Sequence, residues 1–171
     1  MNYFYTPNDI AVFLLKANFP LKFEQAILTN LWEEQNHIAN KFKHDKFAFM
    51  RAVQLEIASY IFKNEIDELD LILRDVEPNY VLLNPCYEHD IILRFFKIIQ
   101  LELFYIPNKD YYKIKLRRLL KRFGYKRRSS SLIQHITQTL TVLSLTPYLR
   151  GYASCDIATI DIDTMVMIRL K

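Results

Sequence analysis

The sequence predicts a mainly helical fold that ends in a small β-sheet, and three observations carry this prediction. Glycine is nearly absent, since only Gly124 and Gly151 occur in 171 residues, and tight hairpins usually need glycine or asparagine at positive φ. The breaks before residue 108 come instead from proline and asparagine, which is typical of helices joined by short turns. Apolar residues recur every three or four positions up to about residue 143, whereas beyond Pro147 they alternate with polar residues.

The composition indicates a folded protein of the cytoplasm. Hydrophobic residues make up 51% and charged residues 25%, which favours a packed core over disorder. The two cysteines, Cys86 and Cys155, are too few for a disulfide framework or a zinc site, so we expect free thiols in a reducing compartment. The first residues lack the pattern of a signal peptide. The uncharged run Ser129–Leu149 contains Gln, His and Thr, so we expect an amphipathic helix and no membrane contact.

Five helices are expected in a helical region that spans residues 1–107. The first begins after Thr6, a suitable cap, with Pro7 at its first position and Asp9 near its third. The apolar stripes of the other four, in chain order, are Phe23, Ile27 and Leu31; Met50, Val53, Ile57 and Ile61; Ile66, Leu69, Leu73 and Val76; and Ile92, Phe96, Ile99 and Leu103. The last stripe is widened by Ile91, Phe95 and Ile98, which is typical of a central helix.

Two more helices and a small sheet are expected in residues 108–171. A helix over 108–123 would bury Tyr112, Leu116, Leu119 and Phe123 and end at Gly124. A second helix, capped within Ser129–Ser131, would bury Leu132, Ile136, Leu140 and Leu143. Alternation predicts strands at 158–162 and 166–170, with a further short strand at 148–151, and no strand before about residue 145.

The order of elements in residues 108–171 resembles a winged helix. A helix, a basic turn and a second helix would form a helix-turn-helix, and a small sheet follows it. The resemblance implies that the second helix is a recognition helix and that the region binds DNA. The helical region 1–107 would then serve dimerisation or partner binding.

Charge is distributed unevenly along the chain. Residues 109–128 hold ten Lys or Arg against one Asp, a net charge of +9, while the rest of the chain holds 13 basic and 18 acidic residues, a net charge of −5. Several of the cations are spaced by four, which destabilises a helix by roughly 0.2–0.5 kcal/mol per pair. This indicates a counter-charge, and nucleic-acid phosphates are one candidate. Two alternatives stay open: the helix macrodipole, and pairing with the acidic segment 65–77 within one molecule or between copies.

The candidate DNA-binding residues fall into two groups. Ser129 and Ser130 would offer hydroxyl and backbone N–H groups to phosphate at the start of a helix, and Gln134, one turn further on, would meet base edges. The expected phosphate contacts are Lys113, Arg117, Arg118, Lys121, Arg122, Lys126, Arg127 and Arg128.

Enzymatic signals are weak, and we assign no catalytic residue, metal ligand or cofactor. Asp156, Asp161 and Asp163 suggest a metal-dependent nuclease as a third interpretation, but the solvated face of an edge strand explains them as well. The leading hypothesis is therefore a cytoplasmic DNA-binding protein, a regulator that could form homodimers. The alternative is a non-enzymatic interaction or inhibitor module whose basic face docks on an acidic partner.

Overall fold

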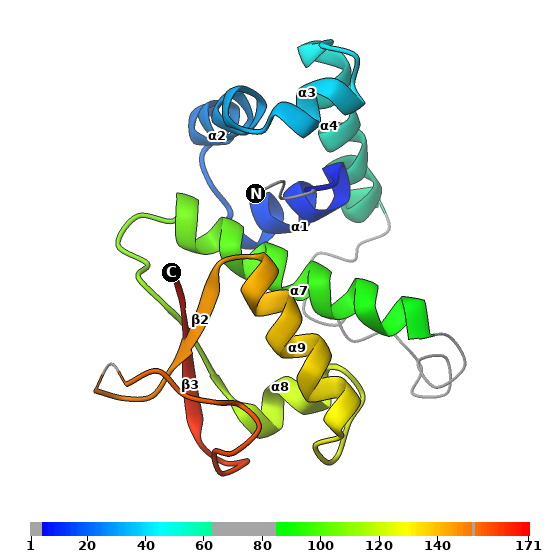
Figure 1. Cartoon of the computed structure of the whole chain (residues 1–171). Helices are drawn as coiled ribbons and strands as arrows, with labels where there is room; N and C mark the ends of the chain where they lie inside the picture. The colour runs from blue at the N-terminus through cyan, green and yellow to red at the C-terminus, as the bar shows by residue number, and fades with distance from the viewer. Residues whose placement is uncertain (1–4, 63–84, 152) are drawn as a thin grey trace. The chain divides into compact units, whose positions relative to one another are not determined.

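The computed structural model describes residues 5–62, 85–151 and 153–171 (Figure 1). Contacts between residues divide the chain into two compact units. Unit 1 is Met1–Leu69 and unit 2 is Asp70–Lys171. The described residues form seven helices and one three-stranded antiparallel sheet, so the expected mainly helical fold with a small sheet is confirmed. The helix expected around Ile66 to Val76 lies outside the described residues. The helix at 85–105 belongs to unit 2, whereas the sequence-based boundary placed it in the first region.

Unit 1 consists of helices in its described part: α1 (Pro7–Ala17), α2 (Leu21–Glu34), α3 (Asn36–Lys41) and α4 (Lys46–Phe62). The start of α1 is as expected, because the Thr6 hydroxyl accepts from the Asp9 N–H at 3.1 Å while the Asp9 carboxylate accepts from the Thr6 N–H at 2.9 Å. This reciprocal capping box satisfies two backbone donors that a helix start leaves without partners.

Side chains of α1 and α4 hold these two helices together. The Asn8 amide donates to Glu56 at 2.8 Å and to the Tyr60 hydroxyl at 3.0 Å. The apolar stripes predicted for α2 and α4 are buried only in part, because Phe23 and Ile61 keep 55% and 53% of their surface exposed.

The described part of unit 2 combines three helices with the sheet. Its elements in chain order are α7 (Pro85–Tyr105), β1 (Tyr112–Lys115), α8 (Leu116–Arg122), α9 (Ser130–Val142), β2 (Leu145–Tyr148) and β3 (Met165–Leu170). The strand order is β1-β3-β2, with both pairs antiparallel, so the last strand lies in the centre. α7 packs against α9 and β3, and its predicted stripe is buried, in agreement with the expected central position.

The expected helix over 108–123 is wrong in its first half, and so is the expectation of no strand before residue 145. Residues 112–115 form β1, with Tyr112 opposite Ile168 and Lys115 opposite Met165. The helix starts at Leu116, directly after the strand. Ile114 is buried between the exposed Lys113 and Lys115, which is the alternation of a strand.

The expected strand at 158–162 is also wrong, because two aspartates form local turns there. The Asp156 carboxylate accepts from the Ala158 N–H at 2.8 Å, and the Asp161 carboxylate accepts from the Asp163 N–H at 2.7 Å. Such side-chain bonds give the backbone an alternative to a strand ladder. The strand expected at 166–170 is confirmed as β3, and the short strand before it lies at 145–148 rather than at 148–151.

The connection from β2 to β3, which we call the wing loop (residues 149–164), starts as a narrow hairpin. Tyr148 bridges to Ser154, and the Leu149 N–H donates to the Ala153 carbonyl at 2.8 Å. Gly151 sits at its tip with φ +99°, a conformation that favours glycine, beside the exposed Arg150.

Nowhere in residues 5–62, 85–151 and 153–171 is a helix long and apolar enough to cross a membrane.

Candidate nucleic-acid interface

α8 separates its apolar and basic residues onto different sides. Leu116, Leu119 and Leu120 are buried, whereas Arg117, Arg118 and Lys121 are exposed. This follows from their helical spacing, since residues three and four apart share a face. Gly124, with φ +82°, ends the helix as the sequence predicted. The local fold therefore turns most of the positive charge of α8 toward solvent.

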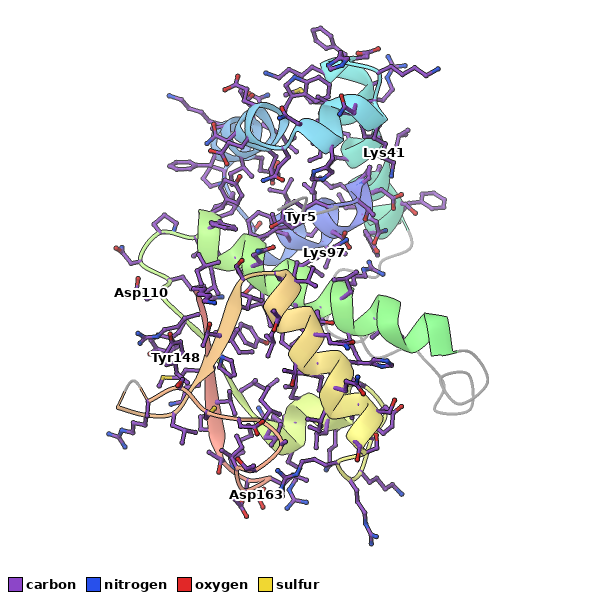
Figure 2. All side chains as sticks on the ribbon, in the orientation of Figure 1. Tyr5, Lys41, Lys97, Asp110, Tyr148 and Asp163 are labelled. Atoms are coloured by element: carbon purple, nitrogen blue, oxygen red, sulfur yellow. The ribbon has the colours of Figure 1, made fainter. Side chains whose placement is uncertain are left out.

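Arg117 is paired with a carboxylate of the wing loop. Its Nε and Nη2 donate to Oδ1 and Oδ2 of Asp163 at 2.7 and 2.6 Å (Figure 2 labels Asp163, just before β3). The hydrogen bond from Arg117 lowers the pKa of Asp163 below its ordinary value, and the same bond raises the pKa of Arg117. The Arg117 N–H also donates to the Ile162 carbonyl at 2.8 Å. Arg117 thus joins α8 to the wing loop, with its charge partly neutralised.

Arg128 has a similar role in the turn between α8 and α9. Its Nη1 donates to three carbonyls of the wing loop: Ile157 at 3.3 Å, Ala158 at 2.7 Å and Ile160 at 2.7 Å. The same part of the wing loop is held by a local turn, because the Asp156 carbonyl accepts from the backbone N–H groups of Thr159 and Ile160. Arg128 is half-buried, so its guanidinium stabilises the wing loop in the folded chain.

Arg122 also makes a structural contact, because its guanidinium lies 5.1 Å from the centre of the Phe95 ring. The other five cations that were predicted to contact phosphate are exposed. They form no ion pair with a carboxylate in the described part of the chain; they are Lys113, Arg118, Lys121, Lys126 and Arg127. The acidic segment 65–77, the alternative partner of these cations, lies outside the described residues.

Sequence reasoning passed over two further cations of unit 2. Lys115 is exposed on β1, within the basic segment, and Arg150 is exposed near the tip of the wing loop. Residues 85–171 hold 15 Lys or Arg against 7 Asp or Glu, a net charge of +8. The signal for Arg150 was its place beside one of only two glycines, which marks a hairpin tip.

α9 begins and packs as expected. The Ser129 hydroxyl accepts from the Leu132 N–H at 3.2 Å, and the predicted stripe is buried. At the other end, the buried Gln100 of α7 donates from Nε2 to the Leu143 carbonyl at 2.6 Å. Both ends of the helix are therefore fixed by hydrogen bonds, at the first by its own cap and at the second by α7.

The exposed side chains of α9 are uncharged and, apart from Val142 at the end of the helix, polar. The polar ones are Ser130, Ser131, Gln134, Thr137, Gln138 and Thr141. The sequence-based assignment included Ser130 and Gln134 but missed Thr137, Gln138 and Thr141. The signal that would have found them is helical periodicity, because these positions lie opposite the stripe of Leu132, Ile136 and Leu140.

A hollow of about 340 Å³ lies between α9 and the strand that follows it. Its lining includes Thr137 and Thr141 of α9, Cys155 and Asp156 of the wing loop, and Lys171. Burial, followed by the nearby Asp156 charge, raises the pKa of the Cys155 thiol, which makes it a weak nucleophile near neutral pH. The side chain of the other cysteine, Cys86, lies outside the described part. Asp156 contributes a carboxylate side chain to this lining.

The C-terminal aspartates do not gather into a metal site. Asp163 binds Arg117, while Asp156 and Asp161 accept from backbone N–H groups in turns, so the interpretation as the face of an edge strand is wrong. No group of three or more His, Cys, Asp or Glu side chains within the described ranges is arranged to hold a metal ion.

Comparison of the chain with protein-family models, with curated proteins and with solved structures gives no match.

Proposed function

We propose that unit 2 is a winged-helix domain that binds duplex DNA. The pair α8 and α9 corresponds to a helix-turn-helix, with α9 as the recognition helix, and the β2–β3 hairpin corresponds to the wing. Two observations support this assignment. The β2–β3 hairpin directly follows α9 along the chain, and the strand order β1-β3-β2 joins this hairpin to the strand before α8.

The observation that carries the proposal is the set of exposed cations immediately before α9. Lys121, Lys126 and Arg127 make no ion pair with a carboxylate among the described residues, and the helix that follows them is uncharged on its exposed face. Phosphates supply the missing counter-charge, and a helix that carries no charge can approach base edges between them.

Different residues have different roles in this proposal. Lys126 and Arg127 contact phosphates beside the start of α9, where Ser129 and Ser130 add hydroxyl and backbone N–H groups. Arg117 and Arg128 instead hold the wing loop against α8 and the turn, as their hydrogen bonds indicate. No cofactor is needed for this function. A regulatory role and a location in the cytoplasm remain predictions.

Titration of labelled duplex DNA at several salt concentrations tests the proposal. About four to six phosphate contacts give a slope of log K against log salt of roughly −4 to −5, because each contact contributes about −0.9. Replacing Lys126 and Arg127 together by Glu should weaken binding to every sequence and make the slope shallower by about 1.8.

The matched control is Lys41→Glu combined with Arg51→Glu, two exposed cations of unit 1. It changes the net charge by the same amount outside unit 2. An equal loss of affinity in the control would show that only net charge matters, and the absence of binding at low salt would end the proposal.

The second candidate function is protein–protein interaction through unit 1. α4 exposes large apolar side chains, since Phe47, Leu55 and Phe62 keep 85%, 64% and 92% of their surface accessible. Their spacings of eight and seven residues place them on one side of the helix. Exposed apolar groups in such a row favour a partner or a second copy of the chain. A light-scattering mass of a dimer, lowered to a monomer by Leu55→Ser, would support self-association; a monomeric mass of the unmodified chain would exclude it.

A further inference from the structure

The uncharged face of α9 has a composition that suits particular bases. Gln134 and Gln138 are four residues apart, and so are Thr137 and Thr141, and all four are exposed. Residues 129–149 contain no Lys, Arg, Asp or Glu. Every polar contact that this face can make therefore comes from amide, hydroxyl or imidazole groups.

These groups match adenine and thymine better than guanine in the major groove. A glutamine amide presents an acceptor and a donor side by side, which fits the N6 amino group and the N7 acceptor of adenine. The methyl group of threonine can contact the C5-methyl of thymine. Guanine presents two acceptors, O6 and N7, for which Arg or Lys is the usual partner, and α9 contains neither.

We propose that α9 reads A·T base pairs in the major groove, so that the protein prefers A·T-rich duplex DNA. This inference rests on the proposed DNA-binding function and adds the class of sequence that is recognised. Gln134 and Gln138 bind adenine edges, and Thr137 and Thr141 contact thymine methyl groups. The Thr141 hydroxyl donates to the Thr137 carbonyl at 2.9 Å, so apolar contact is the main interaction left to that side chain.

The structure also separates affinity from sequence preference. Most exposed cations in the described part of unit 2 lie in β1, α8, the turn after it and the wing loop, and Lys171 follows β3, whereas the base-reading candidates lie in α9. Contacts with phosphate carry no sequence information, so loss of a glutamine should change which duplex is preferred and leave general binding in place. The hydrogen bonds at both ends of α9 hold its exposed face in a fixed orientation, which base readout requires.

The test compares matched duplexes of equal length with the full chain at one salt concentration. An A·T-rich duplex should bind more tightly than a G·C-rich duplex by about 5- to 150-fold for each glutamine–adenine pair formed. Replacing adenine by 7-deazaadenine removes the N7 acceptor, and replacing thymine by uracil removes the methyl group. Both changes lie in the major groove, so each should reduce the preference if α9 reads the bases there.

Two variants at one position sharpen the test. Gln138→Ala should lower the preference for the A·T-rich duplex by about fivefold or more and leave binding to the G·C-rich duplex unchanged. Gln138→Arg should raise affinity for duplexes that contain guanine at the contacted position. Lys126→Ala is the control, and it should weaken binding to both duplexes by the same factor.

The outcomes separate the two proposals. Equal affinity for the two duplexes would overturn the A·T inference, and so would a preference that survives both base analogues, since it would then come from the minor groove or from DNA shape. Either result would leave DNA binding intact. No binding to any duplex at low salt would instead overturn the proposed function itself.

Discussion

The two successive helices α8 and α9 differ in almost every surface property. α8 has four cations in seven residues, whereas α9 has no charged residue in thirteen. Both bury a leucine-rich stripe, so the difference lies only in what they present to solvent. It teaches that positive charge in this unit is placed beside the candidate recognition helix and not on it, which is the arrangement expected when one element attracts a polyanion and another discriminates among its sequences.

The cations of the basic segment are of two kinds, those that bind other parts of the fold and those that are exposed. The neighbouring residues Arg127 and Arg128 allow the two kinds to be compared. Arg128→Met removes three hydrogen bonds to wing-loop carbonyls, so the free energy of unfolding should fall by about 1–3 kcal/mol. Arg127→Met, one residue earlier, should change it by less than about 0.5 kcal/mol because that side chain is exposed. Urea denaturation of both variants measures the difference. Equal free energies of unfolding for the two variants would contradict the structural role of Arg128.

The next largest effect should come from releasing Arg117. Asp163→Asn removes the charge that partly neutralises this arginine and leaves α9 unaltered. We expect tighter binding to all duplexes and a salt slope steeper by up to about 0.9, because one more cation can meet phosphate. The preference between A·T-rich and G·C-rich duplexes should not change. A changed preference would break the separation of roles between the two helices.

The smallest expected effect concerns pH. In the folded chain Arg117 holds the pKa of Asp163 below its ordinary value, so the pair stabilises the fold above the unfolded-state pKa of about 3.8 and this contribution is lost as pH falls through the lowered value. The difference in melting temperature between the unmodified chain and Asp163→Asn should thus be constant above about pH 5 and should shrink in more acid solution. A difference that is equally large at pH 3 would argue against a charged Asp163. The exposure of the pair keeps the effect small.

How far the sequence predicted this fold depended on whether the deciding interactions were local. The start of α1 and of α9 followed from Thr6 and Ser129, because a capping side chain acts within three residues. β1 was missed because it is four residues long and is defined by pairing with residues 165–168. Tyr112 and Leu116, its first residue and the one after its last, are also spaced like neighbours on a helix.

The geometry of the candidate site could be predicted from the sequence only in part. The basic segment was evident from composition, and the cap and Gln134 from helical position. The hydrogen bonds of Arg117 and Arg128 within the fold were not evident from the sequence, because their partners lie 46 and 30 residues further along the chain. Composition cannot distinguish a cation that waits for a ligand from one that is bound within the fold, since that difference arises only from tertiary contacts.

Because β3 lies in the centre of the sheet, the sheet of unit 2 can form only after this strand has been synthesised. β1 and β2 are not neighbours in the sheet, and β3 is the strand that pairs with each of them. Tyr112 must therefore wait for Ile168, 56 residues later, before its strand is paired. Helices α7 to α9 can form from local contacts as the chain emerges from the ribosome, but β1 and the edge of β2 that faces β3 stay unpaired until the last strand arrives. A chain that ends before residue 165 has the basic segment and α9 but no sheet to hold them.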